Sequence, residues 1–403
     1  MTQQQLAIDG GAPVRDSFLV FGRPVLGDEE INEVIDTLRS GWIGTGPKAV
    51  RFEQDFARYV GSKHALAVNS CTAALHLGLI ANHIGPGDEV ITTPLTFAAT
   101  ANVIMHVGAK PIFVDIDPIT LNIDPDNIER AITPKTKAII PVHFGGLSCD
   151  MDRIEAIAKR HQLAIIEDAA HATGTRYHGR LIGSDTGTVA CFSFYANKNL
   201  TTAEGGMITT DNDELADRIA VFRLHGLSKH AWQRYSSKKL MLSDALYPGY
   251  KYNMPDIVAA LGIHQLAKQE RFLEIREQYA RCYDEAFASL PGVRLQPRPR
   301  DLDQNRHALH LYVLILDPQQ FRVDRNDIMS ALLAENIGAA LHYRAVHTHP
   351  FYRETFGYQH DDFPIAAQIG DNILSLPLTP GMSSHDIDDV IMAVNKVLRT
   401  YQR

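Results

Sequence analysis

The chain has 403 residues, of which 45% are hydrophobic and 21% are charged, and its formal net charge is −8. This length allows two domains with a large core. The negative charge disfavours general binding to nucleic acids or anionic membranes, although it is compatible with a local pocket for a small phosphorylated ligand. The N-terminus lacks the apolar core of a signal peptide, and no run of about 18 apolar residues occurs, so we expect a cytoplasmic protein without transmembrane helices.

The cysteine pattern and the absence of common motifs narrow the chemistry further. The four cysteines lie far apart and form no CxxC pair, so we expect reduced thiols rather than a disulfide framework or a zinc site. The sequence also contains no HExxH or GxxxxGK[ST] motif, and no GxGxxG that follows a strand and opens a helix. These absences argue against a zinc protease, a P-loop enzyme and a dinucleotide-binding fold.

The first predicted elements are two helices separated by a glycine-rich loop. A helix is predicted over 28–38, with Asp28 as its cap. Its apolar face would consist of Ile31, Val34, Ile35 and Leu38. Residues 40–47 read SGWIGTGP, and three glycines in eight residues predict a loop in which Trp42 is unusual. The next helix is predicted over 51–59.

From residue 65 onward, strand and helix patterns alternate. Strands are predicted at 65–70, 89–94, 111–116, 138–144, 163–168, 188–194 and 206–211, and helices at 72–84, 97–106 and 152–161. The strand segments are continuously apolar rather than alternating, which is typical of a parallel sheet covered by helices on both faces. Helices between successive strands imply right-handed crossovers. We therefore predict an α/β domain over 40–254.

The pattern changes after residue 254. A long helix is predicted over 255–290, with Pro255 at its first position. Strands at 310–316 and 337–343 and helices at 324–335 and 384–398 follow. We expect residues 255–403 to form this connecting helix and a small α+β domain, and residues 1–39 to pack on that small domain.

Two segments of the predicted α/β domain carry the residues with the clearest chemistry. Asp168 ends the apolar strand in IIEDAAHATGT, and Lys198 follows a later strand in CFSFYANKNLTTAEGGM. Ligands of such sheets bind beyond the carboxyl ends of the strands. A lysine amine can condense with the aldehyde of pyridoxal phosphate (PLP), and a carboxylate can keep the ring nitrogen protonated so that the ring accepts electrons. The two segments together therefore predict a PLP site.

Each of these residues also has a structural alternative. Lys198 by itself reads as a surface lysine, and Asp168 as a helix cap. Glu167 points to the opposite face of a regular strand and is expected to be structural. His171 could bond the phenolic oxygen of the cofactor. Asp168 and His171 could instead ligate a metal, but no third ligand has suitable spacing.

Further residues could complete a cofactor site at the same edge of the sheet. The helix that starts near residue 72 offers backbone N–H groups and the hydroxyls of Ser70 and Thr72 to a phosphate, or Ser70 is a plain helix cap. Phe97 could stack on a flat ring, or belong to the core. Ser193 could add a hydroxyl to the phosphate, or be an ordinary strand serine.

In these motifs the chain resembles the DegT/DnrJ/EryC1/StrS family of PLP-dependent sugar aminotransferases. The resemblance runs nearly end to end, through SGWIGTGP, NSCTAALH, EDAAHATGT, FSFYANKNLTTAEGGM, RLHG, YKYNMPDIVAALG and LHYRAVH in family order. It implies fold type I of PLP-dependent transferases (aspartate aminotransferase-like), an α/β fold with a large, mostly parallel sheet domain and a smaller α+β C-terminal domain. It also implies a homodimer with shared active sites.

The resemblance assigns roles residue by residue. Lys198 corresponds to the Schiff-base lysine, Asp168 to the partner of the ring nitrogen and His171 to the residue near the phenolic oxygen. The remaining cofactor contacts would come from Ser70, Cys71, Thr72, Phe97, Ser193 and, from the neighbouring subunit, Asn253. The sugar nucleotide would be bound by Trp42, Thr45, Arg223, His225, His342, Tyr343 and His347.

The activity implied by the resemblance is transfer of an amino group from glutamate to the C4 ketone of a nucleotide-linked sugar. HGLSKHAWQRY, PGYKYNMPDI and IGAALHYRAVHT are most similar to family members that act on a UDP-linked 4-keto-pentose for lipopolysaccharide and lipid A modification. Phe97 stands where those members have tryptophan, and Tyr195 where relatives often have histidine. Arg223 and Arg344 are candidates for binding the carboxylates of glutamate.

Four alternatives stay open at this point. A nucleotide-linked 4-keto-6-deoxyhexose of the perosamine or bacillosamine type is the alternative substrate. A sugar dehydratase of this fold would carry histidine in place of Lys198. A regulatory protein would need a DNA-binding module, of which the sequence has no trace. A metal-dependent hydrolase would use Asp168 and His171 without requiring Lys198.

Overall fold

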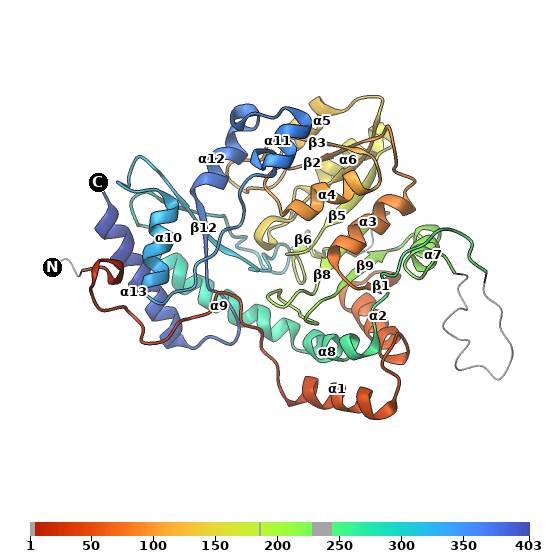
Figure 1. The fold of residues 1–403 in the computed structure, drawn as a ribbon, viewed down its shortest axis with the longest axis horizontal. Helices are drawn as coiled ribbons and strands as arrows, with labels where there is room; N and C mark the ends of the chain where they lie inside the picture. The colour runs from red at the N-terminus through yellow and green to blue at the C-terminus, as the bar shows by residue number, and fades with distance from the viewer. Residues whose placement is uncertain (1–4, 185–186, 228–243) are drawn as a thin grey trace.

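The computed structural model describes residues 5–184, 187–227 and 244–403. Figure 1 shows a larger part built around one sheet beside a smaller part, with the long helix α9 (Gln269–Phe287) extending from the first into the second. None of the described helices combines the length and the apolar character needed to cross a membrane.

The sheet of the larger part has seven strands in the order β1-β9-β8-β5-β4-β2-β3. They are β1 (His64–Val68), β2 (Glu89–Thr92), β3 (Lys110–Phe113), β4 (Thr136–Ile140), β5 (Ala164–Asp168), β8 (Val189–Ser193) and β9 (Gly206–Thr210). The pairs from β3 to β8 are parallel, as predicted. The strand β9 runs antiparallel to both β8 and β1, a reversal that the apolar pattern alone did not indicate.

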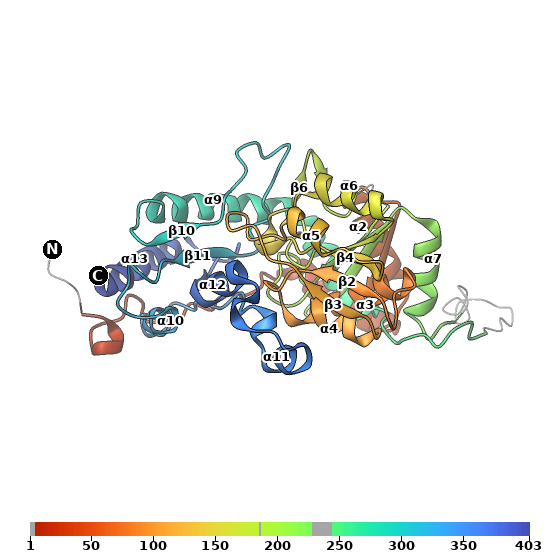
Figure 2. The same cartoon turned by 90° about the horizontal axis from the view of Figure 1, so that it is seen from above.

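Helices cover both faces of this sheet. One face carries α3 (Cys71–Ala81), α4 (Ala98–His106) and α7 (Asp213–Phe222), and the other carries α2 (Pro47–Val60), α5 (Pro125–Ala131), α6 (Met151–His161) and α8 (Asp256–Ala267). Figure 2 shows α5 and α6 on one side of the strands and α3 and α4 on the other. Neighbouring residues of one strand therefore enter different cores: Ile166 packs on the α3 face and Ile165 on the α6 face. Burial on both faces explains the continuously apolar strand sequences.

The smaller part contains an antiparallel sheet in the order β10-β11-β12. Its elements are β10 (Val293–Leu295), β11 (Tyr312–Leu316), β12 (Ile373–Leu376), α10 (Arg325–Ala334), α11 (Pro350–Phe356), α12 (Pro364–Asn372) and α13 (Ser384–Tyr401). The short pair β6 (Arg176–Tyr177) and β7 (Arg180–Leu181) and the 3-10 turns η1 (Ala7–Asp9), η2 (Phe144–Gly146), η4 (Val346–Thr348) and η5 (His360–Asp362) complete the described elements. Leu6 enters the core of this part, and Arg15 pairs with Asp386 and Asp389 of α13.

The helix α1 (Asp28–Ser40) turns a face toward the protein that the sequence did not predict. Ile31 and Leu38 are 52% and 53% exposed, whereas Glu30 and Thr37 are fully buried. The reason is a polar contact with α8: Glu30 binds the amide of Gln265 and the ammonium of Lys268. The capping residue of this helix is Gly27. Asp28, which was predicted as the cap, is the first residue of the helix itself.

Two other predicted elements are wrong. The helix predicted over 255–290 is broken at Lys268 into α8 and α9, and Pro255 lies in the capping position before α8 rather than in its first turn. The strand predicted over 337–343 does not form, because Ile337 and Ala340 make only isolated bridges to Leu19 and Ser375. The third strand of the smaller sheet is instead β12. Neither this strand nor the helices α5, α7, α11 and α12 were predicted from the sequence.

Candidate active site

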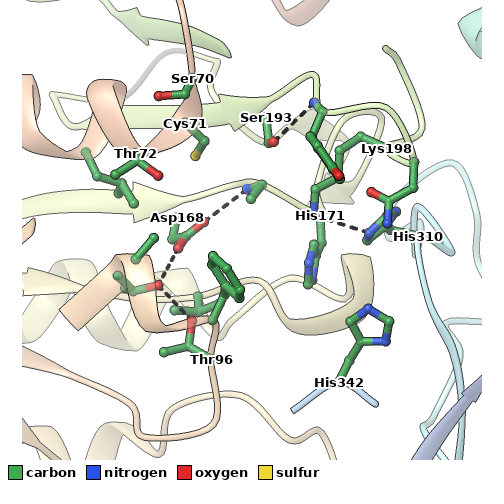
Figure 3. Close-up of a pocket in the computed structure, with 18 of the residues that line it drawn as sticks. Ser70, Cys71, Thr72, Thr96, Asp168, His171, Ser193, Lys198, His310 and His342 are labelled. Atoms are coloured by element: carbon green, nitrogen blue, oxygen red, sulfur yellow. Dashed lines mark hydrogen bonds between the residues drawn. The ribbon is translucent and has the colours of Figure 1, made fainter. Parts of the chain in front are cut away.

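A cavity of about 350 Å³ lies where the carboxyl ends of β5 and β8 meet the start of α3 and the smaller part of the protein. The structure brings ten of the expected site residues to it: Ser70, Cys71, Thr72, Phe97, Asp168, His171, Ser193, Lys198, His342 and Tyr343. In Figure 3, Ser70, Cys71 and Thr72 lie at one end, and Lys198, His310 and His342 at the other.

Asp168 is the last residue of β5 and is 6% exposed. Its Oδ2 accepts a hydrogen bond of 2.7 Å from the Thr100 hydroxyl, and its Oδ1 accepts one of 3.2 Å from the Ala170 N–H. Burial raises the pKa of this carboxyl, while these hydrogen bonds and the charge of Lys198 oppose the rise. Glu167 points to the opposite face of β5, as expected, and there accepts hydrogen bonds from His143 and Thr188.

Lys198 is held in a turn just after β8, where its N–H donates to the Tyr195 carbonyl over 3.0 Å. Burial lowers the pKa of its ammonium from 10.5 to about 8, although the neighbouring Asp168 favours the charged form. At pH 7 a shift of this size makes the neutral amine about 300 times more abundant than in an ordinary lysine. A nucleophilic amine is therefore available at neutral pH.

The start of α3 forms the opposite end of the cavity. Ser70 caps the helix by accepting a hydrogen bond of 3.1 Å from the Ala73 N–H. The N–H groups of Cys71 and Thr72 belong to the first turn, which offers them no intrahelical acceptor and carries a partial positive charge. A Cβ atom on Gly206 would lie 2.6 Å from the Ser70 carbonyl carbon, so glycine is required for β9 to approach this turn. The backbone groups of this turn suit an anion such as a phosphate.

The imidazole of His171 has protein partners on both nitrogens. Its Nδ1 accepts a hydrogen bond of 3.2 Å from the Gly145 N–H, so in the neutral ring Nε2 carries the proton and donates to the Tyr343 hydroxyl over 3.0 Å. Burial holds the pKa of this histidine well below its usual range. His171 therefore orients Tyr343 at the cavity wall and adds no charge there.

Three expected residues lie together away from the described cavity. The indole N–H of Trp42 donates to the Thr45 carbonyl over 3.1 Å, and the Thr45 hydroxyl donates to the Met254 carbonyl over 2.7 Å. The amide of Asn253 donates to the Thr45 hydroxyl. Within one chain, Trp42, Thr45 and Asn253 thus line none of the cavity.

The remaining expected residues have other surroundings. Arg223 pairs with Glu53 and donates to the Ala67 carbonyl over 2.9 Å, which attaches α7 to the edge of the sheet. His347 is fully buried and bonds the His360 carbonyl over 3.0 Å. His225 lies outside the cavity lining, and residues 228–235 of the HGLSKHAWQRY segment lie outside the described residues.

Several residues that line the cavity were not predicted to belong to the site. They are Leu75, Thr96, Ala99, Thr100, Val142, Ala170, Asn197, Glu204, Gly205 and His310. Tyr195, which the family resemblance placed near the cofactor, lines the cavity as well. Thr96 and Thr100 are four residues apart, a spacing that places two hydroxyls on one side of a helix start and could have been noticed. His310 has no such signal, since only the packing of the smaller part brings it to Lys198.

These residues fit PLP. A buried carboxylate suits its cationic ring nitrogen, a lysine of lowered pKa suits its aldehyde, and a helix N-terminus suits its phosphate. The described part of the chain has no group of three or more His, Cys, Asp or Glu side chains arranged to hold a metal ion.

Comparison with known proteins agrees with this geometry. Residues 24–395 match the DegT/DnrJ/EryC1/StrS aminotransferase family. The spore coat polysaccharide biosynthesis protein SpsC of Bacillus subtilis is 54% identical over 96% of this chain and 98% of its own length. The PLP form of the putative sugar aminotransferase Spr1654 from Streptococcus pneumoniae superimposes with a TM-score of 0.87 at 33% identity, covering 95% and 99% of the two chains. DesI, solved in the presence of its TDP-sugar product, gives a TM-score of 0.84 at 30% identity, covering 97% and 96%.

The extent of these matches confirms the resemblance inferred from the sequence. The family and the solved PLP form of a structural relative also confirm the predicted cofactor and fold type I architecture. The chain belongs to the DegT/DnrJ/EryC1/StrS aminotransferase family and is a PLP-dependent sugar aminotransferase.

Proposed function

We propose that this enzyme transfers the amino group of glutamate to the C4 ketone of a nucleotide-linked sugar, in the cytoplasm and for a surface glycan. The observation that carries the proposal is the placement of Asp168, Lys198 and the start of α3 around one cavity. DesI, which was solved with a TDP-sugar product, supports a nucleotide-linked substrate, and SpsC, named for spore coat polysaccharide, supports a surface glycan. The four unpaired cysteines support a reducing compartment.

Four features of the cavity have defined tasks in this proposal: Lys198, Asp168, the start of α3 and Ser193. When bound, PLP supplies an aldehyde that takes up the amino group and a ring that accepts electrons. Lys198 holds the cofactor and, once its amine is free, removes the proton from the amino-bearing carbon of the donor. Asp168 would offer a fixed negative charge to the cationic ring nitrogen, which favours the uptake of electrons by the ring. The start of α3, with Ser193, holds the phosphate.

We also propose a homodimer in which each subunit completes the site of the other. Asn253, Thr45 and Trp42 are linked to one another but lie away from the cavity of their own chain, as expected if they serve a partner. The apolar face of α1 supports a subunit contact, because Ile31 and Leu38 would otherwise leave hydrophobic surface in water.

The keto sugar itself has two candidates. Similarity of sequence segments favours a UDP-linked 4-keto-pentose. Phe97 lines the cavity where the pentose enzymes have tryptophan, and its smaller ring favours a 4-keto-6-deoxyhexose, which carries one more methyl group. The two sugars differ by one methyl group at C5, worth about 1–3 kcal/mol in an apolar pocket. Both candidates therefore belong in one substrate panel.

The first experiment is a visible absorption spectrum of the purified protein with PLP, before and after glutamate, beside Lys198→Ala. We expect a visible band that glutamate abolishes in the wild type and that is absent or altered in the variant. A wild-type protein that gains no band with PLP would overturn the cofactor site. Faster conversion by aspartate or alanine than by glutamate would overturn the choice of donor. UDP-, dTDP- and GDP-linked 4-keto sugars then identify the acceptor.

A further inference from the structure

A buried histidine of the smaller part, His310, faces the amine of Lys198. Its Nε2 lies 3.3 Å from the lysine Nζ, and the side chain is 5% exposed. Figure 3 shows His310 beside Lys198 at one end of the cavity, away from Ser70 and Thr72. The residue precedes β11, and hydrogen bonds of Asn199 with Ala308 and His310 attach this segment to the loop after β8.

The neighbouring Asn199 determines which nitrogen of His310 carries the proton. The Asn199 amide nitrogen donates to the Ala308 carbonyl over 2.7 Å, so its Oδ1 must be the atom that meets His310 Nδ1 at 3.3 Å. A carbonyl oxygen only accepts, and Nδ1 is therefore protonated. In a neutral imidazole this leaves a lone pair on Nε2, the atom that faces Lys198.

The surroundings of His310 keep the ring neutral. Burial is the main cause of a pKa well below the usual range, and the positive charges of Lys198 and Arg276 act in the same direction. Arg276 is buried, and it donates to the carbonyls of Leu309 and Leu378 over 3.0 and 2.5 Å. It thus fixes the backbone next to His310 while its charge opposes protonation of the ring.

We propose that His310 is a positioning residue that accepts a hydrogen bond from the Lys198 amine whenever the amine is not attached to the cofactor. The acceptor keeps the amine at one place in the cavity during the interval in which it must remove and return a proton. This inference rests on the proposed function of Lys198. It adds a role for the smaller part of the protein, which supplies the acceptor.

The test uses the holoenzyme loaded directly with pyridoxamine phosphate, in which the lysine amine is free. Acetic anhydride labels neutral amines, and mass spectrometry of the peptide that contains Lys198 gives the labelling as a function of pH. In His310→Met the Lys198 ammonium loses its hydrogen-bond acceptor, which disfavours the charged form and lowers the pKa of the amine. We therefore expect the pH midpoint of labelling to fall by about one unit. In His310→Gln the side-chain oxygen can accept in its place, and the midpoint should stay within about 0.3 units of the wild type.

Steady-state kinetics give a second readout. We expect His310→Met to lower kcat by about tenfold while KM for glutamate changes less than about twofold, since the proposed role of the imidazole is a contact with Lys198 and not with the donor. His310→Gln should recover most of kcat. His76→Gln is the matched control, because His76 is also buried but lies outside the cavity lining, and it should move neither readout.

Equal labelling midpoints in wild type and His310→Met would overturn the proposal, and so would a fall of the midpoint in His310→Gln as large as in His310→Met. A failure of the proposed function is distinguishable, because it appears as a wild-type protein whose visible band does not respond to glutamate. The labelling experiment does not depend on that response, since the cofactor is loaded directly.

Discussion

The substitution Thr100→Val tests whether a hydroxyl maintains the charge on Asp168. The Thr100 hydroxyl donates to Asp168 Oδ2 over 2.7 Å in a fully buried place, and valine has nearly the same shape without the hydroxyl. A hydrogen bond to a buried charged group contributes about 1.5–3 kcal/mol, which corresponds to about 1–2 pKa units. Burial already raises the pKa of Asp168, so the substitution should raise it further.

The sign of the pH effect follows from the form of Asp168 that the reaction needs. The ionised carboxylate is present above its pKa, so kcat/KM for glutamate should decline as pH falls through that value. In Thr100→Val this decline, the acid limb of the pH profile, should move to higher pH by about one unit. At pH values well below the limb, kcat/KM of the variant should be about tenfold lower than that of the wild type. The assay is the rate at which glutamate bleaches the visible band, followed from acid to neutral pH.

Two neighbouring variants serve as controls. Thr100→Ser keeps the hydroxyl and should behave like the wild type. Thr96 lies 2.8 Å from the Thr100 oxygen, and since the Thr100 proton is used on Asp168, Thr96 must be the donor in that pair. Thr96→Val should therefore shift the acid limb in the same direction but less. An acid limb that does not move in Thr100→Val would refute the reasoning.

Three further predictions concern loading, assembly and stability. The rate at which PLP attaches to Lys198 should rise with pH up to about 8 and level off above it, since only the neutral amine reacts; a rise that continues to pH 10 would contradict the lowered pKa. Lys198→Ala and Asn253→Asp should each be inactive alone yet regain activity when mixed, because a shared dimer then contains one intact site; no recovery in a verified mixed dimer would exclude shared sites. Glu335 is fully buried and binds Lys396 over 2.8 Å, so Glu335→Gln should destabilise the protein by about 3 kcal/mol in urea unfolding. The matched control Glu29→Gln removes an exposed partner of Lys268 and should leave the unfolding midpoint close to that of the wild type.

Much of the larger part of the fold was predictable because strands buried on both faces are continuously apolar. The segments around Ile139 and Ile165 are therefore recognisable in the sequence. The same rule could not reveal that β9 is antiparallel, since its five residues are as fully buried as those of β8. The apolar pattern of α1 predicted the helix but not its orientation: the side buried within the chain is polar and held by ion pairs, while Ile31 and Leu38 are left exposed.

The site was predictable where motifs follow strands along the chain. Asp168 and Ser193 end neighbouring parallel strands, so their placement at one edge follows from the alternation of strands and helices. Tyr343 and His342 were assigned only through the family resemblance, and His310 was missed altogether. These three come from the smaller part, and no local pattern predicts how that part sits against the cavity.

The charges around the cavity explain why buried histidines suit this chemistry. His171, His310 and His342 lie close to Lys198, and burial lowers all three pKa values, that of His342 to about 3. As neutral rings they donate and accept hydrogen bonds without competing with a cationic ring nitrogen for Asp168. A protonated imidazole at the position of His310 would repel the Lys198 ammonium. It would also have no lone pair on Nε2 to accept a hydrogen bond from Lys198. The cavity can therefore combine one fixed carboxylate with one amine that titrates near neutral pH, which is the pairing that amino transfer on PLP requires.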